Sequence, residues 1–144
     1  MRVTTKGRYA LRALTTLALH EGDRPVPIKT IAEEEDLSPE FLEQIFFRLK
    51  KADIIKSVRG PGGGFMLKQH PSEISAKDIF VAVGEGIDLT PCTSAEEDCD
   101  RRNDCVVTEI WQDASAYILD YFSRLTLESI LEKHASQADE AVRV

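Results

Sequence analysis

Apolar side chains recur at helical spacing in the first part of the chain. One series lies within residues 7–20 and consists of Ala10, Leu14, Leu17 and Ala18. A shorter series follows Pro27 and consists of Ile28, Ile31 and Ala32. Residues three and four apart share one face of an α-helix, so both stretches are predicted to be amphipathic helices. The first is predicted to end at residues 22–25, and the second at the acidic run 33–36.

A third helix is predicted after residue 38, where the start signal is strong. Ser38 suits the N-cap, Pro39 suits the first helical position, and Glu40 places a carboxylate in the first turn. The face predicted to be buried carries Leu42, Ile45, Phe46 and Leu49. The residues left on the outward face are Glu43, Gln44, Phe47, Arg48, Lys50 and Lys51.

A glycine-rich turn at residues 60–64 separates two strand-like runs, 54–59 and 65–68. Glycine adopts positive φ without a Cβ penalty, so this pattern predicts a β-hairpin. A phosphate-binding loop is disfavoured, because no Lys-Ser/Thr pair follows and no helix begins there. Two helices followed by a hairpin form the plan of a winged helix-turn-helix. The predicted fold class is mostly α with a small β-hairpin, comprising this domain and a long C-terminal dimerisation helix.

The outward face of the third helix and the hairpin contain candidate DNA-binding residues. The N-terminal part of a recognition helix lies nearest to the bases, where Glu accepts from cytosine, Gln pairs with adenine and an aromatic edge contacts a thymine methyl. Basic residues elsewhere would hold phosphates. The alternative is that Phe41 belongs to the core and the cations form a solvated face. The predicted DNA contacts are Thr4, Lys6, Arg8, Tyr9, Ser38, Phe41, Glu43, Gln44, Arg48, Arg59, Gly60, Pro61 and Gly62.

Beyond the hairpin, Ser75 and Asp78 form a capping signature for a short helix that ends at Gly84. Residues 88–104 lack periodicity and are predicted to form an exposed loop. A longer helix over residues 106–124 carries a heptad-like stripe that we expect to form a dimer interface, the alternative being that it packs on its own domain. This stripe consists of Val107, Trp111, Ala114, Ile118, Tyr121 and Leu125.

The predicted organisation has four parts. Residues 1–84 form the winged helix-turn-helix domain, and residues 85–105 form a cysteine-containing, cluster-binding loop. Residues 106–134 form the dimerisation helix and a terminal helix that Thr126 begins. Residues 135–144 are expected to be a flexible tail.

Composition and charge agree with this division. The 144 residues carry a net charge of −7, and the charge is +3 over residues 1–70 and −10 over residues 71–144. The basic part therefore coincides with the predicted DNA-binding motifs. The chain is long enough for one core but not for two enzyme domains. No apolar run reaches the length of a membrane span and no secretory leader is evident, so we expect a cytoplasmic protein with no membrane partner.

The chain has three cysteines, all within the predicted loop: Cys92, Cys99 and Cys105. An odd, clustered set favours a ligand group over a disulfide framework. Thiolates are soft ligands that suit zinc and iron–sulfur clusters. The position of Cys105 at the start of a helix is expected to lower the pKa of its thiol.

Taken together, these motifs resemble the Rrf2 family of winged-helix regulators, and most of all its IscR-like members. The likeness lies in residues 1–10, 37–49 and 57–65 and in the three cysteines followed by Trp111, and it extends over nearly the whole chain. The resemblance implies a homodimer that binds a double-stranded DNA operator. It also implies an iron–sulfur cluster, either [2Fe-2S] or [4Fe-4S], that controls operator binding in response to iron, cluster, oxidative or nitrosative status.

The sequence departs from the family pattern at the fourth ligand. IscR-like proteins have a histidine three residues after the last cysteine, where this chain has Thr108, and NsrR-like proteins have an N-terminal aspartate where this chain has Arg8. The spacing from Cys92 to Cys99 is also one residue longer than in the IscR-like pattern. The cluster type therefore stays open. The candidate fourth ligands are Glu109, Thr108 and Asp104, besides an external thiol or water.

Other functions stay open beside this one. The chain could be a zinc-dependent or thiol-redox regulator without a cluster, or a CymR-like regulator that a partner enzyme controls. An enzyme with Cys105 as nucleophile is disfavoured, because the sequence has no nearby histidine, nucleophile elbow or phosphate loop. Repression is the expected regulatory effect, since the resembled family leans that way.

Overall fold

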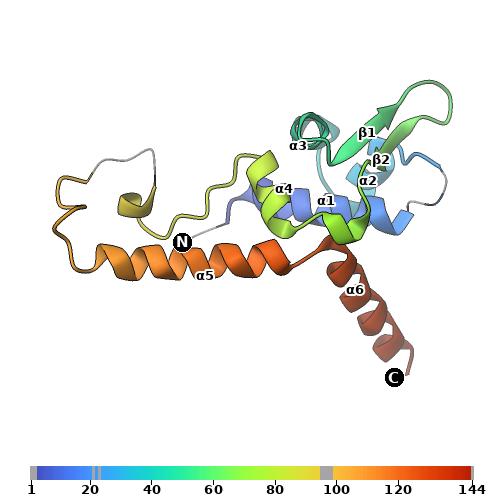
Figure 1. Cartoon of the computed structure of the whole chain (residues 1–144). Coiled ribbons are helices and arrows are strands. Elements are labelled where there is room, and N and C mark those ends of the chain that lie inside the picture. Colours follow the sequence, from blue (N-terminus) through green and yellow to red (C-terminus); the bar gives the residue numbers. More distant parts are fainter. Residues whose placement is uncertain (1–2, 21, 23, 95–98, 144) are drawn as a thin grey trace.

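The predicted helices and hairpin are present in the computed structural model, which describes residues 3–20, 22, 24–94 and 99–143 (Figure 1). This part of the chain contains six α-helices and one two-stranded antiparallel sheet, which confirms the predicted mostly α fold with a small β-hairpin. The elements are α1 (Thr5–His20), α2 (Ile28–Glu35), α3 (Pro39–Lys51), β1 (Ile55–Val58), β2 (Gly64–Leu67), η1 (Pro71–Glu73), α4 (Ala76–Ala82), η2 (Pro91–Thr93), α5 (Thr108–Arg124) and α6 (Leu127–Val142).

One apolar core joins α1–α4, the hairpin and the first turn of α6. Its largest fully buried side chains include Leu14 of α1, Phe46 of α3 and Leu127 of α6. The ring of Phe46 meets that of Phe65 from β2 edge to face, with centroids 5.0 Å apart. Burial of these side chains is the main favourable term that holds α3 against the hairpin.

A segment before α2 pairs with the hairpin through an isolated β-bridge. Ile55 pairs with Leu67 and Val58 with Gly64 across the sheet. Val26 and Phe65 exchange two backbone hydrogen bonds, with N···O distances of 2.9 and 2.8 Å. These bonds tie the hairpin, which is the wing of the winged helix-turn-helix, to the segment that precedes α2. The end of the wing nearest the core is therefore held in place.

We predict that Gly64→Ala destabilises the wing. A Cβ at this position would overlap the backbone of Val26 and Pro27, and neither can move without breaking the bridge to Phe65. Overpacking of this kind is expected to lower the free energy of unfolding by about 2–3 kcal/mol, measured by urea denaturation. Gly62→Ala is the matched control: its φ of +75° is strained for alanine but the space is open, so about 1 kcal/mol is expected. Equal losses for the two variants would contradict the prediction.

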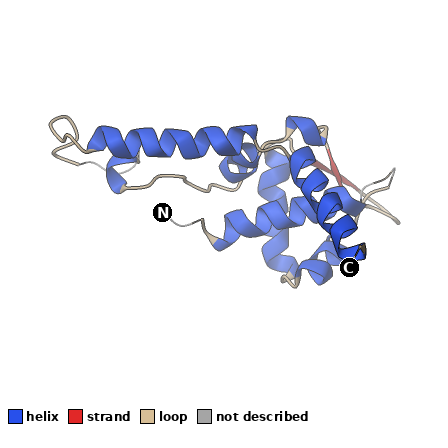
Figure 2. Ribbon diagram, turned by 90° about the horizontal axis from the view of Figure 1, so that it is seen from below, coloured by secondary structure: helices blue, strands red, loops and turns tan. Residues whose placement is uncertain are grey.

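Helix α5 forms an arm that extends from the winged body, with residues 85–94 running beside it (Figures 1 and 2). A second apolar cluster fastens the arm, in which Ala76, Phe80 and Ile87 are buried. The side chains of α5 and its C-cap that pack on this cluster are Ile118, Leu119, Phe122 and Leu125. Two backbone hydrogen bonds, Ala76 N–H to Leu125 O and Leu127 N–H to Ile74 O, both 2.8 Å, hold the junction of α5 and α6.

The structure changes two expectations drawn from the sequence. Ile118 and Leu125, two members of the predicted dimer stripe, pack on the chain's own domain and not on an exposed face. Residues 135–142 continue α6 as exposed helix, so the tail expected from residue 135 is helical up to Val142. None of the helices in the described ranges is long and apolar enough to cross a membrane.

Candidate DNA-binding surface and cysteine segment

The N-terminus of α3 is capped as predicted. The hydroxyl oxygen of Ser38 accepts a hydrogen bond from the backbone N–H of Phe41 at 3.1 Å, and Pro39 occupies the first turn. The four residues predicted to be buried, Leu42, Ile45, Phe46 and Leu49, are all buried. The cap and the core together fix which face of α3 is exposed.

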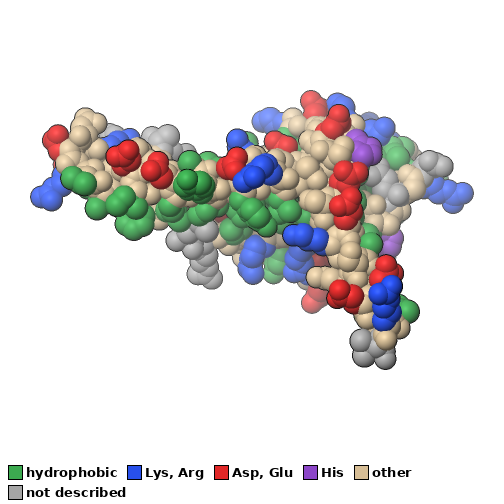
Figure 3. Space-filling model, turned by 60° about the horizontal axis from the view of Figure 1, so that its bottom comes forward, with side chains coloured by type: hydrophobic (Ala, Val, Ile, Leu, Met, Phe, Trp, Pro, Cys, Tyr) green, Lys and Arg blue, Asp and Glu red, His purple; other side chains and the backbone are tan. Residues whose placement is uncertain are grey.

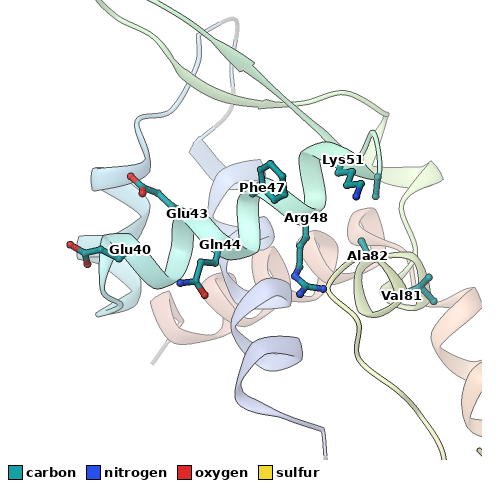
Figure 4. Close-up of a pocket in the computed structure, with 9 residues that line it drawn as sticks. Glu40, Glu43, Gln44, Phe47, Arg48, Lys51, Val81 and Ala82 are labelled. Carbon is teal, nitrogen blue, oxygen red and sulfur yellow. The ribbon is translucent and has the colours of Figure 1, made fainter. Parts of the chain in front are cut away.

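The exposed face of α3 borders a groove of about 1050 Å³ that reaches α4 (Figure 4). Glu43, Gln44 and Arg48, three predicted DNA contacts, line it together with Glu40, Phe47 and Lys51. Val81 and Ala82 of α4 close the far side. The groove mixes acidic, amide, basic and aromatic groups, the set of side chains that reads base edges and phosphates.

Phe41 lies at the edge of the core rather than fully outward. Its ring is half-buried and meets Tyr9 of α1 edge to face, with centroids 6.0 Å apart. The guanidinium groups of Arg8 and Arg12 lie 5.8 and 5.3 Å from the Tyr9 ring. The packing of Phe41 therefore supports α3 on α1, and the cations gather around Tyr9.

A buried carboxylate organises the start of α1. Glu85 is only 8% exposed, and its side chain accepts hydrogen bonds from the Thr4 backbone N–H, at 3.0 Å, and from the Thr4 hydroxyl. A negative charge at a helix N-terminus is favourable. Thr4, a predicted phosphate contact, is thus joined to the first residue of the predicted cysteine loop. This pairing spans 81 positions, and no local sequence signal indicates it.

The remaining predicted DNA contacts lie on the surface. Lys6 is half-buried and Arg8 is exposed on α1, and four residues of the turn between β1 and β2 are all exposed: Arg59, Gly60, Pro61 and Gly62. Gly60 and Gly62 have φ of 95° and 75°, the positive values that the turn was predicted to need.

The three cysteines lie between α4 and α5, in a stretch that we call the cysteine segment. Their three thiols are free. Cys92 and Cys105 are half-buried and Cys99 is exposed. The Sγ of Cys92 lies 2.9 Å from the Thr90 hydroxyl oxygen. In the part of the chain that the structure describes, no three His, Cys, Asp or Glu side chains are gathered as a metal site. The structure therefore does not bring the predicted ligands together.

Cys105 lies just before the first turn of α5. A hydrogen bond from the Thr108 side chain, and then one from the Val107 backbone, lower the pKa of the Cys105 thiol from its ordinary value because they stabilise the thiolate. Thr108 is buried, whereas Asp104 and Glu109 are exposed. Thr108, one of the three candidate fourth ligands, thus contacts Cys105 in this conformation.

The outer face of α5 is apolar and exposed. Tyr117 is 78% exposed and Ile110 is 57% exposed, and neither belongs to the stripe predicted from sequence. They continue the surface of Val107, Trp111 and Tyr121, which was predicted. Figure 3 shows hydrophobic side chains gathered along this arm. The exposed stripe of α5 therefore consists of Val107, Ile110, Trp111, Tyr117 and Tyr121, with half-buried Ala114 among them, at heptad spacing.

Comparisons with known proteins agree with this architecture. Residues 3–133 match the model of the Rrf2 family, described as an iron-dependent transcriptional regulator. The regulators IscR of Pectobacterium atrosepticum and of Photorhabdus laumondii are each 40% identical over 131 residues, which is 91% of this chain and 79% of each relative.

Solved structures give the same result. IscR of T. potens matches with a TM-score of 0.76 and 32% identity, over 93% of this chain and 88% of that one. CymR, the global cysteine regulator of B. subtilis, matches with a TM-score of 0.77 and 30% identity, over 92% and 98%. These relatives are transcriptional regulators rather than enzymes. The chain belongs to the Rrf2 family and is an IscR-like transcriptional regulator.

Proposed function

We propose that this protein is a cytoplasmic, homodimeric repressor whose operator binding is controlled by an iron–sulfur cluster at Cys92, Cys99 and Cys105. One observation carries the proposal: the segment that holds all three cysteines joins the DNA-binding body directly to the helix with the exposed apolar stripe. The cysteine segment thus lies between the winged body, which would bind DNA, and α5, which would set the distance between the two α3 helices of a dimer.

DNA binding uses α3 and the wing. Figure 1 shows both at one side of the body, and α3 presents Glu43, Gln44 and Arg48 outward. In the proposed complex α3 enters the major groove, where Glu43 and Gln44 meet base edges and Arg48 meets phosphate. Arg59 at the base of the wing turn contacts the backbone or the adjacent minor groove.

Dimerisation uses the exposed stripe of α5. An apolar heptad pattern on a solvent-exposed helix face is stabilised when a second copy covers it. A two-fold dimer places two α3 helices on one duplex and matches a palindromic operator. Ile118 and Leu125 are excluded from this interface because they pack within one chain.

The donor set suits an iron–sulfur cluster by its chemistry, because three thiols are soft ligands. Asp104, Thr108, Glu109 or an external thiol or water completes the set. When bound, a cluster supplies a redox-active group whose stability depends on iron and oxidants. A change in the conformation of the cysteine segment is passed to α5 and to α1. Cys105 lies three positions before α5, and Glu85 binds Thr4 at the start of α1.

A second candidate is a thiol-redox regulator without a cluster. The observation that favours it is that the three cysteines are free and not gathered around one point in the described residues. Both candidates share the same DNA-binding surface. They differ in whether purified protein contains iron and sulfide.

The DNA-binding surface is tested with Arg59→Ala and a salt titration. Removing one phosphate contact is expected to weaken binding to all duplexes alike and to reduce the slope of log affinity against log salt by about one. Fluorescence anisotropy with labelled duplex measures both quantities. The control is Lys133→Ala, an exposed cation on α6, which should leave the slope unchanged. An unchanged slope for Arg59→Ala would remove the wing from the interface.

A further inference from the structure

Phe47 is an aromatic side chain that the fold does not use. It lies in the middle of α3 and is 68% exposed, while its neighbour Phe46 fills the core. The buried face of α3 is complete without it. The exposed stripe of α5 and the second apolar cluster lie on other elements, so neither accounts for this ring.

The neighbours of Phe47 are the residues proposed to read DNA. Glu43 precedes it by one turn and Lys51 follows it by one turn, and all three line the groove along α3 (Figure 4). Gln44 and Arg48 lie beside this row. A helix that enters the major groove with Glu43 toward the bases therefore carries the Phe47 ring toward them as well.

The major groove offers one apolar group at its base edges, the 5-methyl of thymine. A phenylalanine ring has no donor or acceptor for the other edge groups, so contact with that methyl is the favourable way to bury it there. Four residues of α-helix rise about 6 Å, which is slightly less than two base steps of about 3.4 Å. The thymine should therefore lie within about two base pairs of the base that Glu43 contacts.

We propose that Phe47 is a specificity-determining residue that reads a thymine through its 5-methyl group, close to the base read by Glu43. This proposal rests on the DNA-binding function proposed above. Phe47 thereby takes the aromatic role that the sequence analysis gave to Phe41, whose ring is partly committed to Tyr9.

The test removes the methyl group from the DNA. Duplexes that the wild-type protein selects from a random pool are resynthesised with deoxyuridine at one thymidine at a time. At one position of each half-site, wild-type affinity should fall about fourfold, the ratio for burying one methyl group, and about fifteenfold when both half-sites are changed. Phe47→Ala changes both subunits of the proposed dimer, so its affinity for the thymidine duplex should also fall about fifteenfold. It should show no further loss with deoxyuridine.

Val142→Ala is the matched control. Val142 is an apolar side chain, 86% exposed, but it lies at the end of α6 and not in the groove. This variant should keep the full response to deoxyuridine. The proposal is overturned if wild-type protein tolerates deoxyuridine at every position, or if Phe47→Ala keeps the wild-type response, as it would if the ring met another protein instead. Selection of no duplex at all would contradict the proposed DNA-binding function rather than this reading of Phe47.

Discussion

Replacing Cys92, Cys99 and Cys105 together with alanine is expected to remove all bound iron and sulfide from protein purified without oxygen. The remaining candidate ligands, Asp104 and Thr108 among them, offer oxygen atoms, which are poor substitutes for thiolates at an iron–sulfur cluster. Metal and sulfide analysis and the charge-transfer absorption spectrum measure the loss. The thermal midpoint of the iron-free protein should not change, because none of the three cysteines belongs to the described apolar clusters.

Asn103→Ala provides the control for this experiment, since Asn103 is an exposed non-ligand on the same segment. It should load iron and sulfide as the wild type does. Wild-type protein that stays colourless after anaerobic reconstitution would contradict the cluster assignment. Stoichiometric zinc that is lost from the triple variant would identify the zinc-dependent alternative instead.

A charge placed on the exposed stripe of α5 should separate the dimer. Tyr117→Glu puts a carboxylate at the most exposed position of that stripe, where the proposed interface would have to desolvate it. We expect a monomer by light scattering or sedimentation. Operator affinity should fall by roughly a hundredfold or more, because the two reading helices are then no longer linked.

Gln112→Glu is the matched control for the dimer. Gln112 is exposed on the polar face of α5, so the same charge there should leave a dimer with normal affinity. Because Tyr117 is 78% exposed in the single chain, Tyr117→Glu should not change the fold of the winged body, which circular dichroism checks. A Tyr117→Glu protein that stays dimeric would place the interface elsewhere.

The winged-helix body was predictable because its signals are local. Ser38, Pro39 and the spacing of the buried residues specify where α3 begins and which face it buries. The glycines of the turn require positive φ, and this marks the hairpin. Each of these signals acts within a few residues, so tertiary structure did not alter them.

The faces of α5 could not be separated from sequence alone. The helix is apolar on two adjoining faces, and periodicity does not say which face its own domain covers. That choice depends on Phe80 and Ile87, which pack on Ile118 and Leu125 and leave Ile110 and Tyr117 outside. The exposed stripe therefore differs from the predicted one: it gains Ile110 and Tyr117 and loses Ile118 and Leu125.

The sequence located the cysteine segment along the chain but did not predict its conformation. It has little periodicity, and part of it, residues 95–98, lies outside the described residues. The contact between Glu85 and Thr4 depends on how the chain returns to α1. The contact between Thr108 and Cys105 is local and depends on how the segment enters α5. The DNA-contact set and the ligand set stay predictions, and the experiments above test them.

The central claim, control of operator binding by a cluster, is tested most directly by one comparison. The affinity of the same selected duplex is measured without oxygen for cluster-loaded wild type and for wild type freed of iron, with the triple alanine variant in parallel. The account predicts different affinities for loaded and iron-free wild type, and equal affinities for the iron-free and alanine proteins. Identical affinity for the loaded and iron-free protein on every selected duplex would contradict it.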